Sequence, residues 1–142
     1  MEKIKISELS IGDWVNQKMN DGAYQVQWID REMVGLIKHT GTEEDGSIRL
    51  TAVLLWFIEP IPLTAEILEN NGFEKGEIYE GNSSIVFTNG NISISWFNGA
   101  RWKRLRIYNA LGDTELCSAI VRNVHQLQHA LRLAGVEKEV VL

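Results

Sequence analysis

Hydrophobic and polar residues alternate in short runs along the first 60 residues, which is the pattern of half-buried β-strands. Tyr24, Val26 and Trp28 alternate with glutamines, so we expect these three side chains on the buried face of one strand. Further strands are expected at Gly12–Gln17, Met33–His39 and Ile48–Ile58. Short, tightly turned strands without a helix predict a small curled sheet or barrel of the Src-homology-three kind.

Two prolines interrupt this pattern. Pro60 and Pro62 cannot donate to a sheet ladder, so the strand is expected to end near Glu59. Thr64 is then placed to cap a short helix, and Gly72 is placed to stop it in the left-handed conformation. The stretch therefore predicts a stiff elbow with one short helix between two strand-rich parts of the chain.

The second part again reads as strands, followed by one helix. Strands are expected at Ile78–Tyr79, Ser84–Thr88, Asn91–Phe97, Arg101–Tyr108 and Glu115–Val121. Asn89-Gly90 is the strongest hairpin signal, and Asn123 is a cap residue for a helix over Val124–Ala134 with one apolar stripe. We predict an α+β, β-rich chain, with a curled β unit over residues 1–60 and an antiparallel meander plus a packed helix over residues 61–142.

The composition narrows the class of protein. Of 142 residues, 44% are hydrophobic and 23% charged, which is typical of a folded globular chain. The longest apolar run, Ala52–Ile58, is too short to span a membrane, and the scattered charges near the N-terminus lead us to expect no signal peptide there. A single cysteine excludes an internal disulfide and a cysteine-based zinc cage. We therefore expect a cytoplasmic protein that does not act in a membrane, and we expect its five tryptophans to be buried rings.

The segment RWKRLRIY is the best local candidate for a binding surface. In a strand, one face would carry Trp102, Arg104, Arg106 and Tyr108, and the other Arg101, Lys103, Leu105 and Ile107. A face of aromatic rings and arginines can stack bases and neutralise phosphates. The same face can equally be a solvated sheet surface whose arginines pair with acids, and the net charge of −5 favours that interpretation.

Evidence for a catalytic or metal-binding site is weaker than that for this binding surface. Cys117 lies in an apolar strand context, which favours an inert thiol over a nucleophile paired with a distant histidine. His125 and His129 are four residues apart on the predicted helix, but no third ligand lies near them. We interpret them as polar residues flanking the apolar stripe, and we expect no metal, no cofactor and no enzymatic activity.

One resemblance concerns the elbow and the last helix. The residues Glu59–Thr64, Leu68 and Gly72-Phe73, together with Val124–Gln128, resemble a group of small uncharacterised proteins of gut Bacteroidetes and their phages or mobile elements. The helix departs from that group where it continues as HALRLAG, in place of an aromatic-rich segment. The resemblance implies a phage or mobile-element source and a fold, and it carries no activity.

These patterns lead to two functional hypotheses. The first is a non-enzymatic protein-interaction or assembly module that binds a protein partner, or itself, through sheet edges and an aromatic surface. The alternative is a weak nucleic-acid-binding protein that uses the basic strand over residues 101–108, with Trp102, Arg104, Arg106 and Tyr108 as its binding residues.

Overall fold

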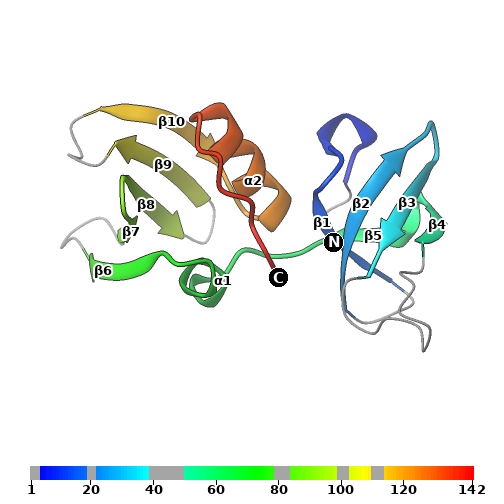
Figure 1. Cartoon of the computed structure of the whole chain (residues 1–142), viewed down its shortest axis with the longest axis horizontal. Helices are drawn as coiled ribbons and strands as arrows, with labels where there is room; N and C mark the ends of the chain where they lie inside the picture. Colours follow the sequence, from blue (N-terminus) through cyan, green and yellow to red (C-terminus); the bar gives the residue numbers. More distant parts are fainter. Residues whose placement is uncertain (1–3, 19–21, 39–49, 79–83, 99–102, 110–113) are drawn as a thin grey trace. The chain divides into compact units, whose positions relative to one another are not determined.

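A computed structural model of the chain describes residues 4–18, 22–38, 50–78, 84–98, 103–109 and 114–142. The chain divides into two compact units (Figure 1). The first unit is Met1–Ile61 with Leu142, and the second is Pro62–Val141.

The first unit is a five-stranded antiparallel sheet in the order β4-β3-β2-β1-β5. Its strands are β1 (Trp14–Gln17), β2 (Ala23–Ile29), β3 (Met33–Ile37), β4 (Leu50–Leu54) and β5 (Ile58–Pro60). Two single-turn 3₁₀ helices accompany them, η1 (Ile6–Glu8) and η2 (Leu55–Phe57). Within the described residues β4 and β5 are the two edges of the sheet, so it is open and not closed into a barrel.

A β-bulge in β2 reverses the face expected for Trp28. Tyr24 and Val26 lie on the core face as predicted, with Val15, Val34, Leu36 and Ile58 among the buried residues around them. The register between β2 and β3 shifts between Val26 and Trp28, so that Trp28 lies opposite Gly35 and not on the core face. The prediction that Trp28 shares a face with Tyr24 and Val26 is therefore wrong.

The single strand expected over Ile48–Ile58 is two strands. β4 ends at Leu54, η2 turns the chain, and β5 begins at Ile58 on the opposite edge of the sheet. Hydrophobicity alone did not show this break, because the residues of η2 are as apolar as the strands on either side.

The short helix of the elbow begins and ends at the residues predicted from the sequence. Pro60 is the last residue of β5, opposite Val15, where its missing N–H removes only the end of the ladder. The hydroxyl of Thr64 accepts a hydrogen bond of 3.2 Å from the N–H of Ile67 and caps α1 (Ala65–Asn70), as predicted. Gly72 has a φ of +85°, which confirms its predicted role in ending the helix.

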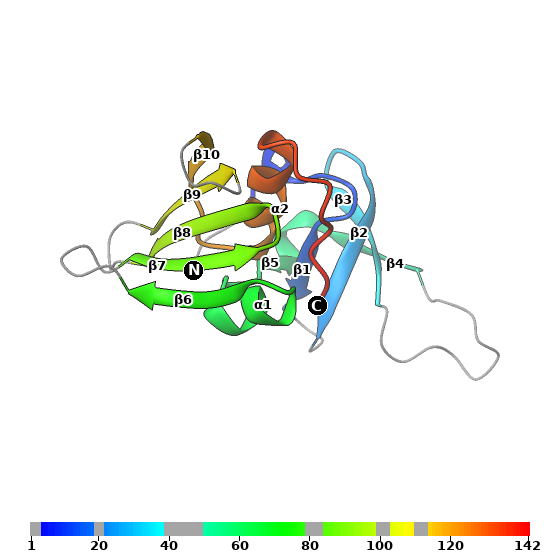
Figure 2. The same ribbon diagram turned by 60° about the vertical axis from the view of Figure 1, so that its left-hand side comes forward.

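The second unit is an antiparallel meander in strict chain order, β6 to β10, with a helix after it. Its elements are β6 (Glu74–Ile78), β7 (Ser84–Asn89), β8 (Ile92–Asn98), β9 (Lys103–Asn109), β10 (Glu115–Ile120) and α2 (Val124–Leu133). Helix α2 lies across one face of this sheet and packs against β10 (Figures 1 and 2). The predicted α+β, β-rich fold is confirmed.

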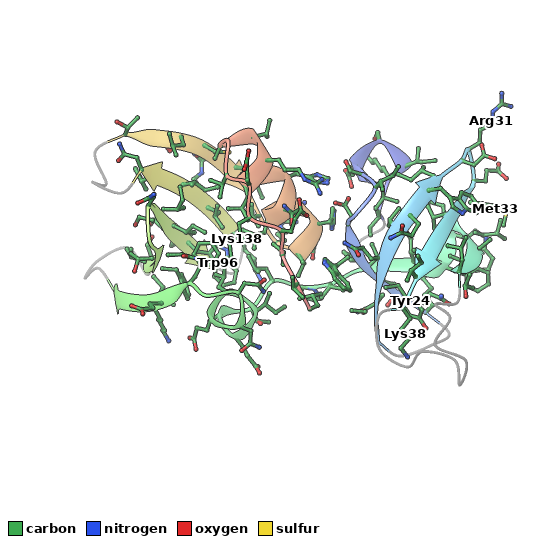
Figure 3. All side chains as sticks on the ribbon, viewed as in Figure 1. Tyr24, Arg31, Met33, Lys38, Trp96 and Lys138 are labelled. Carbon is green, nitrogen blue, oxygen red and sulfur yellow. The ribbon has the colours of Figure 1, made fainter. Side chains whose placement is uncertain are left out.

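The core of this unit is the layer between the sheet and α2. Its largest fully buried sheet side chains are Phe87, Ile94, Trp96, Leu105 and Ile107, and the helix contributes Val124, Leu127 and Leu131. The indole N–H of Trp96, at the centre of the unit in Figure 3, donates to the carbonyl of Val121 over 3.4 Å.

Two buried amide side chains fix the segment that follows α2. Asn71 donates to the carbonyls of Ile67 (2.8 Å) and Val141 (3.0 Å), and its Oδ1 accepts from the N–H of Val141 (2.8 Å). Gln128, on α2, accepts from the N–H of Val140 over 2.6 Å. Because buried amides need partners, these bonds hold the C-terminal segment of the second unit on its core.

Among the residues that the structure describes, no helix has the length and apolar character of a membrane span.

Candidate interaction surfaces

The predicted basic surface lies on the face of the second sheet opposite α2. On β9, Leu105 and Ile107 are buried beneath the helix, so Arg104, Arg106 and Tyr108 point to the other side. We call these three residues the basic face. Arg101 and Trp102, the other members predicted for this strand, lie outside the described residues, so the aromatic platform at Trp102 stays a prediction.

The two arginines of the basic face contact neighbours on β10. Arg106 Nε lies 3.7 Å from Glu115 Oε1, and both side chains are about half exposed. Arg104 Nη1 donates to the hydroxyl of Ser118 over 3.4 Å. Of the two arginines, Arg106 is thus paired with an acid. Exposed ion pairs of this kind contribute roughly 0–1 kcal/mol to the free energy of unfolding.

The strand beside the basic face is neutral. On β8, Phe97 lies opposite Arg104, Ser95 opposite Arg106, and Ser93 opposite Tyr108. Among the described residues, the face therefore offers hydroxyls and two aromatic rings around two positive charges. This composition can hold a polar or planar ligand, but it supplies little of the phosphate neutralisation on which nucleic-acid affinity depends.

A second candidate binding surface lies on the first sheet, and the sequence pattern did not single it out. Side chains on its outer face, away from the core, are uncharged across β2, β3 and β4. We call this set the apolar face: Trp28, Met33, Ile37, Leu50, Ala52 and Leu54. Leu50 is 51% exposed and Met33, labelled on the outer side of this sheet in Figure 3, is 37% exposed.

Trp28 is the centre of the apolar face. Its indole covers Gly35, and a Cβ atom built at Gly35 would overlap Nε1 of the ring. Ala52 lies on the far side of Gly35 in the next strand. The absence of a side chain at position 35 therefore leaves room for the partly buried ring over this position.

The tryptophans do not all have the buried role expected from the sequence. Trp14 and Trp96 are buried, but Trp56 is 60% exposed. Its ring stacks on Phe57 with centroids 3.9 Å apart, and Lys18 Nζ lies 6.0 Å from its centroid. An exposed tryptophan held by stacking is a residue type enriched among binding hot spots.

The four strands at sheet edges in the described part of the chain differ in how they are protected from pairing with another chain. β5 is three residues long and ends in Pro60, β6 begins with the charged pair Glu74 and Lys75, and β10 has a bulge near Cys117. Short length, charge, proline and bulges are the usual protections of an edge. β4 has none of them: LTAVL is uncharged, lacks proline and pairs with β3 in unbroken register.

Cys117 has the properties of an inert thiol. It is half-buried on β10, opposite Ile107, on the same face of the sheet as α2. Burial, and secondarily the negative charge of Glu115, raises the pKa of this thiol above its ordinary value. A raised pKa lowers the thiolate fraction at neutral pH, which is the opposite of what a catalytic cysteine requires.

The histidine pair occupies the helix as expected, but not as an exposed flank. His125 is buried and His129 is half-buried, and their ring centroids lie 5.9 Å apart in an edge-to-face arrangement. The expectation that both flank the apolar stripe is therefore wrong for His125, which is part of the core of the second unit. Within the described segments, no group of three or more His, Cys, Asp or Glu side chains is placed to hold a metal ion.

A scan against protein-family models, a search of curated proteins and a search of solved structures find no match for this chain. Its function is therefore inferred from its own surfaces.

Proposed function

We propose that this chain is a non-enzymatic protein-interaction module that binds its partner through the apolar face of the first sheet. The observation that carries the proposal is the uncharged outer surface around Trp28, with Met33 and Leu50 exposed on either side of it. Contiguous exposed apolar surface of this kind marks interaction sites in folded proteins. Within this face, Trp28 supplies the large, rigid contact area that anchors interfaces.

The absence of an assembled reactive group in the described residues supports a binding role. Burial, and secondarily Glu115, raise the pKa of the Cys117 thiol, and the buried His125 belongs to the packed core. The expected setting is the cytoplasm, with an assembly role of the kind implied for a phage or mobile-element protein. A binding module needs only a surface that is stable and pre-formed, and the outer face of a regular sheet is both.

The experiment compares capture of partner proteins by matched variants. Met33→Lys with Ile37→Lys places two charges on the apolar face and leaves β4 unchanged. Thr88→Lys with Ser118→Lys adds the same charge at exposed positions of the second sheet. Proteins bound to each immobilised chain are quantified by mass spectrometry, after thermal melting shows that both variants are folded.

We expect the first variant to lose, by at least about tenfold, proteins that the wild type and the second variant retain, because a charge in a desolvated interface is costly. Equal capture by all three chains would remove the apolar face as the binding surface. If only the second variant lost captured proteins, the binding surface would lie on the second sheet and not on the apolar face.

A second candidate function rests on the basic face. Arg104 and Arg106 lie on one side of β9 beside the rings of Phe97 and Tyr108, an arrangement in which bases can stack. Titration with single-stranded DNA and RNA at low salt tests it. Binding that weakens with added salt and is lost in Arg104→Glu with Arg106→Glu would support this candidate, and no binding at tens of micromolar would remove it.

A further inference from the structure

The backbone of β4 presents hydrogen-bonding groups to an edge that no described strand covers. The N–H of Leu55 donates to the carbonyl of Glu32 over 2.7 Å and extends the β3–β4 ladder by one step. In an antiparallel ladder, bonded residues alternate with residues whose N–H and C=O point away. Thr51 and Val53 therefore bond to β3, and the intervening residues point their N–H and C=O to the open edge.

Those outward residues form a self-complementary set. They are Leu50, Ala52 and Leu54. If two copies of β4 run antiparallel about a two-fold axis at Ala52, Leu50 of each copy lies opposite Leu54 of the other, and Ala52 lies opposite its own counterpart. Every outward N–H and C=O of the three residues then meets a partner, and the leucines pair across the strands on the outer face.

We propose that β4 pairs with β4 of a second copy of this chain, which joins the two first sheets into one continuous antiparallel sheet. This pairing rests on the proposed function, because it makes the apolar face continuous across both copies. A two-fold axis of this kind is the commonest symmetry of homo-oligomers.

Charge favours a second copy at the edge of β4 over the edge of β6. The net charge of −5 makes two copies repel each other, so self-association is more favourable at a contact without acidic side chains. β4 carries no charge, and neither do its outer-face neighbours Met33 and Ile37 on β3. The same pairing at β6 would bring Glu74 and Lys75 of each copy into the contact.

The expected strength follows from the length of the strand. Five residues give an edge of about 17 Å at roughly 3.4 Å per residue. Such a contact is smaller than a standard interface of about 1,600 Å², so the dimer should be weak and concentration-dependent. It is best observed by sedimentation velocity of the full chain between about 10 µM and 1 mM, the range in which small interfaces associate.

Ala52→Pro tests the proposed pairing most directly. Since the N–H of Ala52 points to the open edge, proline there removes a hydrogen bond to the second copy and none to β3. We expect dimerisation to weaken by at least about tenfold, and Ala52→Lys, which brings two like charges together at the axis, to abolish it. Thr88→Lys is the charge-matched control and should dimerise as the wild type does.

A cross-link tests the register independently. In a Cys117→Ser background, Ala52→Cys should form a disulfide-linked dimer on oxidation, because directly opposed hydrogen-bonded residues have Cα atoms about 5.5 Å apart. Lys75→Cys in the same background, at the charged edge, should give little cross-linked dimer.

A chain that stays monomeric throughout this range, or a dimer that Ala52→Pro does not weaken, would overturn the pairing. The proposed function would survive if the monomer still captured proteins in a manner blocked by Met33→Lys with Ile37→Lys. Capture that is lost in Ala52→Pro from a monomeric chain would show that β4 binds a strand of a different protein, which also overturns pairing with a second copy.

Discussion

The indole of Trp28 covers Gly35 on the neighbouring strand, where the Cβ atom of any other residue would collide with it. This relationship exists because the bulge after Val26 turns the tryptophan away from the core. A large ring that would otherwise fill the interior of the first unit lies instead on its outer face. The small residue beneath it is thus part of the binding surface that we propose.

Gly35→Ala should displace the ring of Trp28. The added methyl group overlaps Nε1, so we expect a loss of about 1–3 kcal/mol in the free energy of unfolding, as for other overpacked sites. Chemical denaturation measures it. In a Trp28→Ala background the same substitution should cost much less, and an equal cost in both backgrounds would show that the backbone, and not the ring, requires glycine.

Asn71→Ala should release the C-terminal segment of the second unit. The substitution removes the two bonds that Asn71 makes with Val141 and a third with Ile67. Each buried polar group left without a partner costs about 1–3 kcal/mol. Hydrogen exchange at the amide of Val141 should accelerate strongly, whereas the amide of Val140, which bonds to Gln128, should be less affected. Unchanged exchange at both amides would contradict the contact.

Thr64→Ala should weaken the start of α1. The hydroxyl that accepts from the N–H of Ile67 is lost, and such caps contribute about 0.5–2 kcal/mol. Thr64→Ser keeps the oxygen and should retain most of the stability. Equal destabilisation by the two substitutions would mean that the methyl group of Thr64, and not its hydroxyl, matters.

Cys117 should react slowly with alkylating reagents and should make stability fall at alkaline pH. Its pKa is higher in the folded chain than in the unfolded chain, because of burial and of Glu115. The folded state therefore binds more protons between the two values, so this contribution is complete below the unfolded pKa and is lost as the pH rises through the folded one. The rate of reaction with iodoacetamide, measured against pH, would show the raised pKa of the thiol. Glu115→Gln should speed this reaction. A native thiol as reactive as that of the unfolded chain would contradict the assignment.

Local signals explain why much of the fold could be predicted. The cap at Thr64, the stop at Gly72 and the hairpin at Asn89-Gly90 each depend on residues within one turn, and the structure has all three features. The helix predicted over Val124–Ala134 differs from α2 by one residue. Alternation in the basic strand likewise placed Arg104 and Arg106 on one exposed face.

The features that the sequence did not reveal depend on contacts between distant segments. A bulge leaves no mark in a run of alternating residues, so Trp28 was expected inside. Asn71 meets Val141 from the opposite end of the second unit, and no local pattern records that pairing. The apolar face was missed for a related reason: neither side of β4 carries a charged residue, so its sequence does not say which side is left uncovered.

The chain order of the second unit has a consequence for its synthesis. Its five strands pair in the order in which they are made, but α2, which covers their apolar side, comes after all of them. At a translation rate of roughly 5–20 residues per second, the segment from Ile120 to Val140 takes about 1–4 s to add. Until α2 packs on the sheet, the face that carries Trp96 and Phe87 has no cover. A chain that ends before Val124 should therefore expose the apolar face of this sheet. Such a chain should aggregate or bind chaperones through that face.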